Sequence, residues 1–381
     1  MTTTFIEPLD VLFLRGNKLF GDAGSFGESL IPPWPSVAAG ALRSAVLAAK
    51  GVDFVAFAAG KLVDAELGTP SDPGAFALHG FQLARKTADG LVERLYPMPA
   101  DWIASKATTS NHDNAMSIKT LRPTALHTGL TASNPLPLVP LLAEATRSKA
   151  ESGVWLTEAG WAAYLQDQVA AANTLVKSAD LWRLDSRVGI GMNAATGSVA
   201  EGKLFTVQAI ALATGVGFVA DTVGVNLSRV HLLRFGGDGR GATCQPITQP
   251  SPTVGYVALA QNKRMKLVLT APALFADGWL PNGVARNDSG AYTLNATGIS
   301  ATLTCAAVPR MEVASGWDLA QHAPKMAERV VPAGAVYWFD AVEASAEALA
   351  DWVAGGLWGG APNATRRAEG FNRFALAHWA A

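Results

Sequence analysis

Residues 31–50, IPPWPSVAAGALRSAVLAAK, contain the clearest fold signal in the chain. Three prolines hold the chain extended, and the Ala/Leu-rich run that follows them has high helix propensity. Ser36 is the expected N-cap, and Gly51 is placed to end the helix as its C′ residue. The sequence therefore predicts a helix over 37–50.

Strand signals lie on both sides of this helix. Residues 5–14, FIEPLDVLFL, combine apolar, β-branched and aromatic side chains and predict an opening strand. Two runs at 75–86 and 91–103 are joined by a turn that ends in Asp-Gly, which predicts a β-hairpin. Residues 104–152 are rich in Ser, Thr, Asn and Pro without a sustained period, so we expect an inserted loop or projecting arm.

A second helix and a strand pair complete the first half of the chain. Thr157 is placed to cap a helix whose apolar residues repeat at helical spacing through Ala172. Strands are expected at 187–192 and 203–213. The resulting order β-α-β-β-α-β is that of a ferredoxin-like domain, which we expect over residues 1–205 with the arm inserted.

The second half carries a weaker copy of the same order. We therefore predict an α+β fold of two ferredoxin-like (RRM-like) domains, the second over residues 206–381. Its strand-like runs are 215–225, 264–271, 299–308 and 330–340, and its helical signals lie at 226–234 and 345–354.

Composition excludes several classes of protein. The 381 residues are 49% hydrophobic and 16% charged, which is typical of a folded chain. Cys244 and Cys305 lie far apart, which argues against a disulfide framework or a zinc cluster and suits a reducing cytoplasm. We see no signal peptide and no apolar run long enough for a membrane span, so we expect a cytoplasmic protein.

Charge is balanced in total but uneven along the chain. The formal net charge is −1, yet the stretch from Arg229 to Lys266 holds six basic residues and one acidic residue. Residues 53–73 and 340–351 each hold four acidic residues. This asymmetry suits a subunit that presents one face to an anionic chain and another to a protein neighbour. Ordinary solvated surface is an alternative of about equal weight.

Ser36, Gly40 and Arg43 share one stripe of the predicted helix. The stripe aligns a cap hydroxyl, a bare backbone and a guanidinium, and the helix N-terminus adds unpaired N–H groups, which together suit the phosphates of a single strand. The alternative of equal weight is structural: Gly40 permits close packing against a sheet and Arg43 pairs with an acid.

Residues 235–241, FGGDGRG, hold four glycines, so their backbone can approach a ligand closely and turn its amides inward. The stretch lacks the Gly-Lys-Ser/Thr ending of a Walker loop. Arg240 and the basic surroundings favour an anion contact, and a surface loop without a ligand is the alternative.

The six histidines do not form a metal-binding pattern, and we expect neither a metal nor a cofactor. His112 and His127 lie in the arm. Either of them could serve as general base if the chain cleaved RNA, although a lone histidine is more often structural or solvent-facing.

A series of short motifs runs through nearly the whole chain. They are LDVLFLRGNKLF (9–20), PPWPS (32–36), AGALR (39–43), RVGI (187–190), EGKLF (201–205), GGDGR (236–240), SGWDL (315–319), VPAGAVY (331–337) and EGF (369–371). In order and spacing they resemble the CRISPR RAMP superfamily, and most closely the third-subunit family of the Cmr module in type III-B effector complexes. Residues 16–20 and 237–240 depart from the patterns common in that family, which leaves open which basic group touches which phosphate.

The resemblance implies two RAMP domains, no nuclease activity and no cofactor. It also implies three kinds of partner: the repeat-derived 5′ tag of the crRNA, the large palm-domain CRISPR subunit beside it, and neighbouring RAMP backbone subunits. Carried over by position, the RNA-binding candidates are Arg15, Asn17, Lys18, Ser36, Gly40, Arg43, Arg187, Gly236, Gly237, Gly239, Arg240 and Trp317. A RAMP endoribonuclease that processes repeat RNA and a pure protein scaffold are the alternatives.

Overall fold

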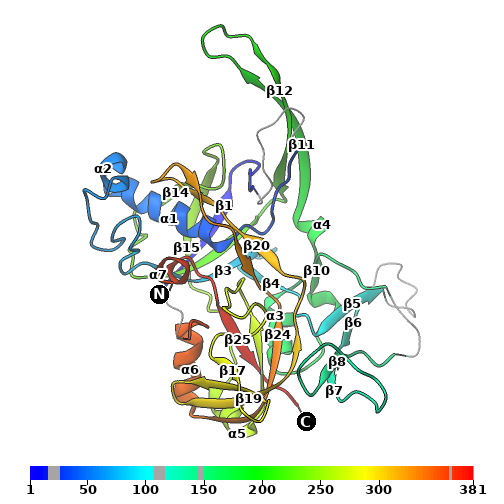
Figure 1. The fold of residues 1–381 in the computed structure, drawn as a ribbon. Coiled ribbons are helices and arrows are strands. Elements are labelled where there is room, and N and C mark those ends of the chain that lie inside the picture. The colour runs from blue at the N-terminus through cyan, green and yellow to red at the C-terminus, as the bar shows by residue number, and fades with distance from the viewer. Residues whose placement is uncertain (16–25, 107–115, 145–148, 360–362, 381) are drawn as a thin grey trace.

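The computed structural model describes residues 1–15, 26–106, 116–144, 149–359 and 363–380. Two large antiparallel sheets form the body of the protein, and a long two-stranded ribbon projects from it (Figure 1). Helices are few and mostly short, so the fold is a mixed arrangement of mostly antiparallel sheets and some helices. In the described part of the chain, no helix is long and apolar enough to cross a membrane.

The first sheet has eight strands in the order β10-β9-β4-β3-β13-β1-β15-β14. Its strands are β1 (Thr2–Pro8), β3 (Ala77–Lys86), β4 (Val92–Pro97), β9 (Val154–Leu156), β10 (Leu175–Lys177), β13 (Val216–Val223), β14 (Leu232–Arg234) and β15 (Gly241–Ile247). Nearly all of β13 is buried, as expected for an apolar strand covered on both faces. The helix α1 (Pro35–Ala49) packs against β3 and β14.

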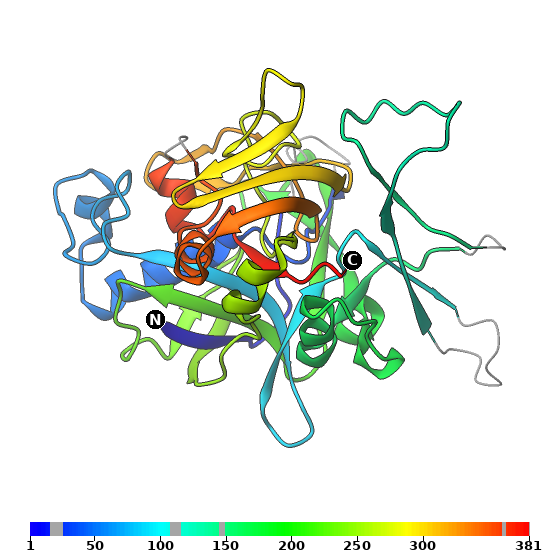
Figure 2. The ribbon, with the colours of Figure 1, turned by 90° about the horizontal axis from the view of Figure 1, so that it is seen from below.

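The second sheet has six strands in the order β17-β18-β19-β24-β16-β25. They are β16 (Met265–Leu269), β17 (Val284–Arg286), β18 (Tyr292–Ala296), β19 (Ile299–Ala307), β24 (Val336–Ala344) and β25 (Phe374–Ala377). The helices α5 (Tyr256–Asn262) and α6 (Ala346–Gly355) pack on each other and on β24 and β25. Figure 2 shows this sheet, in yellow to red, from below.

Smaller pairings extend from the body. The ribbon of β11 (Trp182–Met192) and β12 (Val199–Leu212) is joined in parallel by β2 (Phe26–Gly27). The predicted arm contains two strand pairs, β5 (Trp102–Lys106) with β6 (Met116–Thr120) and β7 (Arg122–Thr124) with β8 (Val139–Leu141), and it protrudes sideways in Figure 2. The remaining pairs are β20 (Glu312–Ala314) with β23 (Glu328–Val330) and β21 (Trp317–Asp318) with β22 (Ala323–Pro324). The short helices are α2 (Phe54–Ala58), α4 (Ser178–Leu181), α7 (Ala364–Ala368) and the 3-10 helix Ala172–Thr174.

The helix α3 (Glu158–Leu165) joins the two sheets through aromatic packing. Its Trp161 ring stacks on Tyr96 of β4 at 4.6 Å between centroids and on Tyr164 at 5.5 Å. These side chains belong to one buried core that also contains residues of the second sheet. The two sheets therefore share a core rather than meeting only at a surface.

The predictions that depend on residues close together in the sequence were confirmed for one hairpin, one helix cap and one helix end. The hairpin β3–β4 forms, Thr157 caps α3 by accepting a hydrogen bond from the Gly160 N–H at 3.3 Å, and Gly51 has φ of 68° after α1. The helix predicted at 345–354 is α6.

One predicted helix start, one predicted helix end and one whole predicted helix were wrong. Trp34, not Ser36, occupies the N-cap of α1, because Pro35 already has the backbone angle of a first helical residue. The helix α3 ends at Leu165, and Asp167 follows with φ of 56°. No helix forms at 226–234, where the Asn226 side chain accepts a hydrogen bond from the Ser228 N–H and turns the chain towards β14.

Strand boundaries also differ from the prediction. The opening strand ends at Pro8, and the run at 330–340 is divided between β23 and β24 by a turn at Gly334, where φ is 91°. The first sheet continues to Ile247, so strands on both sides of residue 206 belong to it.

A buried ion-pair cluster of one lysine and two aspartates lies where α3 meets the second sheet. The Lys266 side chain is 1% exposed, and its Nζ lies 2.9 Å from Asp167 Oδ1 and 3.4 Å from Asp101 Oδ2. Burial raises the pKa of Asp101 despite the attraction of Lys266. Burial also acts to raise the pKa of Asp167, but the Lys266 ammonium outweighs it, so the net pKa is lowered.

We expect Lys266→Met to lower the free energy of unfolding by about 3–5 kcal/mol, because it leaves Asp101 buried without a counter-charge and leaves Asp167 with Arg122 alone as its ion-pair partner. The matched control is Lys50→Met, which removes a partly exposed ammonium paired with Asp64 and Glu66 and should cost less than about 1 kcal/mol. Urea denaturation of both variants measures the difference. Equal losses would contradict the stabilising role of the buried cluster.

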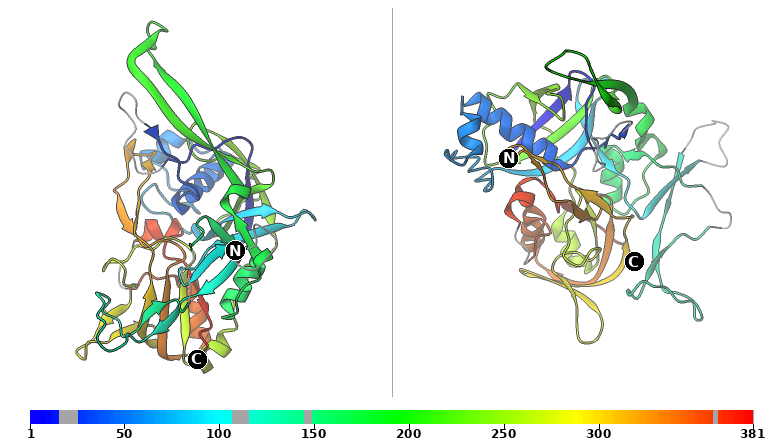
Figure 3. Two further views of the ribbon diagram at one scale, coloured as in Figure 1. Left: turned by 90° about the vertical axis from the view of Figure 1, so that its right-hand side faces the viewer. Right: turned by 45° about the horizontal axis from the view of Figure 1, so that its top comes forward.

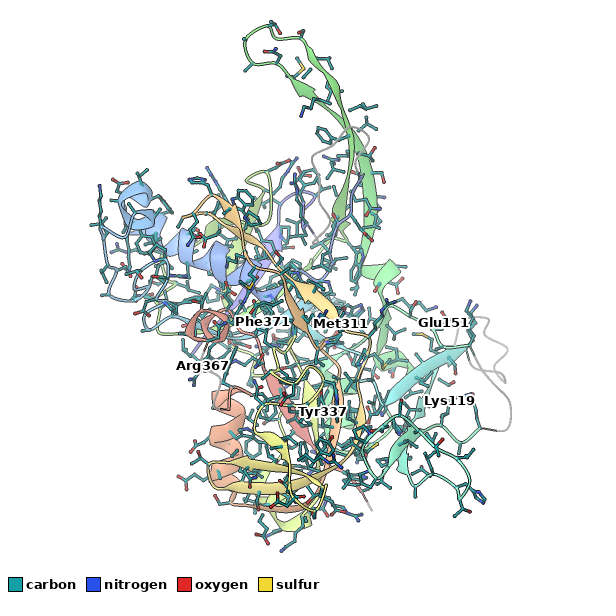
Figure 4. All side chains as sticks on the ribbon, viewed as in Figure 1. Lys119, Glu151, Met311, Tyr337, Arg367 and Phe371 are labelled. Atoms are coloured by element: carbon teal, nitrogen blue, oxygen red, sulfur yellow. The ribbon has the colours of Figure 1, made fainter. Side chains whose placement is uncertain are left out.

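A second group of positive charges lies where β3 meets the C-terminal segment. A Cβ on Gly370 would lie 3.0 Å from the carbonyl oxygen of Leu78, which shows how closely the segment approaches β3. Burial of the His79 ring, followed by the charges of Arg373, Arg367 and the N-terminal amine, lowers the pKa of His79 from 6.5 to about 4. Figure 4 labels Arg367, which belongs to this C-terminal segment.

We expect folding stability to fall as the pH drops from about 6.5 to about 4. In that window the unfolded chain binds a proton at His79 that the folded chain does not bind. His79→Gln should flatten this part of the profile of unfolding free energy against pH, whereas His127→Gln, on the exposed arm, should not. A profile unchanged by His79→Gln would refute the assignment.

Candidate nucleic-acid interface

After β1 the chain continues as an extended segment, residues 9–15, between β15 and β12. The Leu9 N–H donates to the Gly241 carbonyl at 3.0 Å. Leu12 exchanges two backbone hydrogen bonds with Ile210, at 2.9 and 2.8 Å. The segment is therefore held by backbone pairing with residues far away in the sequence.

The end of this segment contains the first predicted RNA contact. Arg15 is exposed, and its backbone forms a β-bridge with Ser29 on the returning chain. Asn17 and Lys18, which were predicted together with Arg15, lie outside the described residues. The described chain thus leads from β1 to Arg15 and resumes alongside it on the way to α1.

The glycine-rich loop between β14 and β15 packs directly on the same segment. The Gly237 N–H donates to the Phe13 carbonyl at 2.8 Å, so this amide serves the fold. A Cβ on Gly236, where φ is 77°, would lie 2.9 Å from that oxygen, so the close approach requires glycine. Gly239, at φ of 62°, is exposed at the outer side of the loop.

Arg240 is held in place by the segment that its loop contacts. Its Nη1 lies 2.6 Å from Asp10 Oδ2, and its guanidinium lies 5.0 Å from the centroid of the Phe13 ring. The charge of Arg240 is therefore already partnered within the chain, and its geometry fixes the loop against residues 10–13.

Arg43 also has an internal role. Its Nη2 donates to the carbonyl oxygens of Leu67 and Thr69, at 3.0 and 2.8 Å. Burial lowers the pKa of Arg43, and the negative charges of Glu369 and Asp72 oppose this shift only in part. The guanidinium fixes the 67–69 loop on α1 through these two carbonyls, and the predicted phosphate contact of Arg43 stays a prediction.

The rest of the predicted stripe on α1 is accessible. No side chain caps the helix at Trp34, and Ser36 is half-buried. Gly40 is exposed, and a Cβ built there would have no atom of the described residues within 4 Å, so close packing against that part of the chain does not explain this glycine. The outer face of α1 therefore has room for a close neighbour at Gly40.

Arg187 lies on β11, which pairs with β12, and β12 in turn pairs with β2 on the chain that returns towards α1. It stands opposite Val207 of β12, which in turn pairs with Gly27 of β2. Its Nε and Nη2 lie 3.0 and 2.9 Å from Asp185 Oδ2 on the same strand. Arg187 is thus near the returning chain but already ion-paired.

Trp317 belongs to a separate excursion of the second half. Its side chain is 57% exposed on the ribbon β21–β22. A small core of Trp34, Ala314, Val330, Trp358 and Phe371 anchors this excursion next to the start of α1. The excursion crosses in front of α1 in Figure 1, and Figure 4 labels Phe371 of this core.

The structure divides the basic run of 229–266 into residues with different roles. Lys266 is buried, Arg264 pairs with Asp340, and Arg240 pairs with Asp10. Arg229 and Arg234 are exposed, and neither has an ion-pair partner among the described residues. Arg234 Cδ lies 3.9 Å from the Cβ position of Gly239, so this cation stands beside the glycine-rich loop.

Arg234 was counted in the basic run but was not among the predicted RNA-binding residues. The run was recognisable by its charge, but only the short strand β14, with Leu233 buried and its neighbours exposed, reveals that Arg234 points outward. A correct strand assignment at 232–234 would have supplied that signal.

The two histidines of the catalytic alternative lie in the arm. His112 lies outside the described residues, and the exposed His127 has its Nδ1 2.9 Å from the Thr128 carbonyl. In the described part of the chain no group of three or more His, Cys, Asp or Glu side chains is arranged to hold a metal ion.

Comparison with known proteins gives one strong relationship. The family model described as "CRISPR-associated protein (Cas_Cmr3)" matches residues 4–379. No curated protein sequence matches. Among solved structures, the chain is similar to one in "Cryo-EM structure of the Type III-B Cmr-beta bound to cognate target RNA", at 15% identity and TM-score 0.47, covering 88% of this chain and 86% of that chain.

A second similarity is to "Crystal structure of Csm3-Csm4 subcomplex in the type III-A CRISPR-Cas interference complex", at 9% identity and TM-score 0.38, covering 88% of this chain and 92% of that chain. The family assignment does not depend on these distant structural similarities. Because the family model spans residues 4–379, this chain belongs to the Cas_Cmr3 family of CRISPR-associated proteins.

Proposed function

We propose that this protein is a non-catalytic guide-RNA-binding subunit of a type III-B CRISPR effector complex in the cytoplasm. In this role it holds the repeat-derived 5′ tag of the crRNA and docks to the large palm-domain subunit and to neighbouring RAMP backbone subunits. Membership of the Cas_Cmr3 family over residues 4–379 supports the proposal. The proposal also includes the prediction that the two halves of the chain are ferredoxin-like RAMP domains.

The observation that carries the proposal is the convergence of three separate motifs. The loop 235–241 is far from the segment 9–15 and the helix α1 in the sequence, yet the loop contacts the segment and the strand that leads into the loop packs on the helix. The Gly237 N–H bonds to Phe13, and β14, which leads into the loop, packs on α1. A shared surface of this kind can follow a single-stranded backbone with side-chain cations and exposed peptide groups.

The contacts within the chain separate the arginines that position loops from those that we assign to RNA binding. Arg43 and Arg240 are committed to carbonyl and carboxylate partners, so we assign them to positioning the loops. Arg234 beside the loop is exposed and is the cation we assign to a tag phosphate, and Arg15, at the end of the first segment, is also exposed and remains a predicted RNA contact. Gly40 leaves room on α1 for the same strand.

We expect Arg234→Ala to weaken binding of a fluorescent RNA that carries the 5′ tag. Loss of one phosphate contact should lower the slope of log Kobs against log salt concentration by about 0.7 for a single strand. The matched control is Arg286→Ala, which removes an exposed arginine from β17 in the second sheet and should leave the slope unchanged. Equal slopes for Arg234→Ala and the parent chain would reject this contact, and no binding by the parent chain or its assembled complex would favour a scaffold.

We further expect purified protein to leave repeat RNA intact during incubation in chelator, because the polar partner of His127 within the described residues is a neighbouring backbone carbonyl oxygen. Gel analysis of labelled RNA measures this. Cleavage that disappears in His127→Ala or His112→Ala would replace the binding proposal with the endoribonuclease alternative.

A further inference from the structure

Three basic side chains come together where β3 meets the C-terminal segment, and we call them the seam cluster. His79 lies on β3, Arg367 on α7, and Arg373 directly before β25. The helix α7 packs on β3, and the segment after α7 closely approaches the Leu78 carbonyl oxygen at Gly370. In both views of Figure 3 the red helical segment lies between the blue helix α1 and the yellow to orange strands of the second sheet.

Arg373 is the buried member of the seam cluster. It is 5% exposed, and its Nη1 donates to the Ala354 carbonyl oxygen near the end of α6, at 2.8 Å. Its Nε is buried and has no hydrogen-bond partner among the described residues. A buried, charged donor without an acceptor is destabilising. An acceptor from outside the described chain would remove this cost.

His79 is positioned by a β-bulge. Gly80 pairs with Asp221 and Leu78 pairs with Thr222, so the register between β3 and β13 shifts at His79 and leaves this residue without an opposite partner. A bulge bends its strand and redirects the side chain of the extra residue. The imidazole is half-buried and forms no hydrogen bond with the described residues. It is therefore available to a ligand.

The acidic residues close to the seam cluster are paired with other cations. Glu369, in the same segment, lies 2.8 Å from Arg366 and 2.5 Å from Lys325. Asp221, opposite the bulge, lies 2.9 Å from Arg94. Within the described residues, neither arginine of the cluster takes part in an ion pair. The positive charge of the cluster is thus not compensated by that part of the chain.

The members of the seam cluster also act on one another. Burial, followed by the charges of Arg373, Arg367 and the N-terminal amine, lowers the pKa of His79. Burial, followed by the charge of Arg367, lowers the pKa of Arg373 to about 10. Such electrostatic effects weaken with distance, so the three side chains lie close together. Like charges gathered in this way raise the local concentration of anions.

We propose that the seam cluster binds a small tetrahedral oxyanion, and that inorganic phosphate is its natural ligand. A guanidinium presents its N–H groups as a planar fork that matches the oxygens of such an anion. Arg373 contacts the anion from inside, Arg367 from the surface, and the His79 ring from β3. The bound anion links the first sheet to the segment that leads into β25.

The burial of Arg373 favours a free ion over an RNA phosphate. An RNA phosphate has a sugar on each side, which hinders its approach to a guanidinium that is 5% exposed. The inference does not rest on the proposed function, and the two can fail separately.

The direct test is an NMR pH titration of the histidines of the full chain in sulfate and in chloride at equal ionic strength. Sulfate keeps its double charge throughout the titration, and His79→Gln identifies the signal. An anion beside the ring favours its protonated form, so sulfate should raise the pKa of His79 from about 4 towards 6.5. Inorganic phosphate should act in the same direction. Equal values in sulfate and chloride would overturn the proposal.

A substitution at the surface of the cluster supplies the second test. Arg367→Gln should weaken sulfate binding about threefold, the effect of losing one partly exposed ion pair. The matched control is Arg286→Gln, which removes an exposed arginine from β17 and should leave sulfate binding unchanged. Equal sulfate affinities for Arg367→Gln and the parent chain would contradict the site.

RNA binding separates the seam cluster from the candidate interface. Arg367→Gln should keep the affinity and salt slope of the parent chain for RNA that carries the 5′ tag, and Arg234→Ala should keep the response of His79 to sulfate. A reduced salt slope in Arg367→Gln, or a His79 signal that responds to RNA but not to sulfate, would assign the cluster to RNA and refute a free-anion site.

Discussion

The antiparallel pairing of β1 with two later strands fixes the position of the candidate interface. One edge of β1 pairs with β13 and the other with β15, so the residues that follow β1 must leave the sheet beside the β14–β15 loop. The Phe13 carbonyl then accepts the Gly237 N–H, and Asp10 pairs with Arg240. The RNA-binding surface that we propose is a consequence of this sheet order, since none of its parts could meet in another arrangement.

Sequence patterns predicted the elements that local chemistry determines. The proline-rich entry to α1, the Asp-Gly turn of β3–β4 and the Thr157 cap act over a few residues, and each produced the expected structure. The division of side chains between binding and packing could not be predicted in the same way. Arg43 bonds to carbonyls 24 and 26 positions away, and Arg240 meets Asp10 across 230 positions. Such partners depend on the assembled sheet and leave no periodic signal.

Charge counted along the sequence was a poor guide to charge at the surface. The six cations between Arg229 and Lys266 suggested one basic patch, but the fold buries one of them with two aspartates and pairs two others with single aspartates. Ion pairing within the fold thus removes several of these cations from the exposed surface, while Arg229 and Arg234 stay exposed. A protein of this kind gains RNA affinity from placement of a few contacts more than from its overall field.

The number of residues that separate two paired strands in the sequence also affects when the protein can fold during its synthesis. Thr4 of β1 bonds to Ala220 of β13, and 216 positions separate them. During synthesis the N-terminal strand therefore has no permanent neighbour until the ribosome has passed β13, and its second edge stays open until β15 emerges. Cotranslational folding of the first sheet must accordingly wait for well over half of the polypeptide, a delay in which chaperones or assembly partners have time to act on the exposed edge.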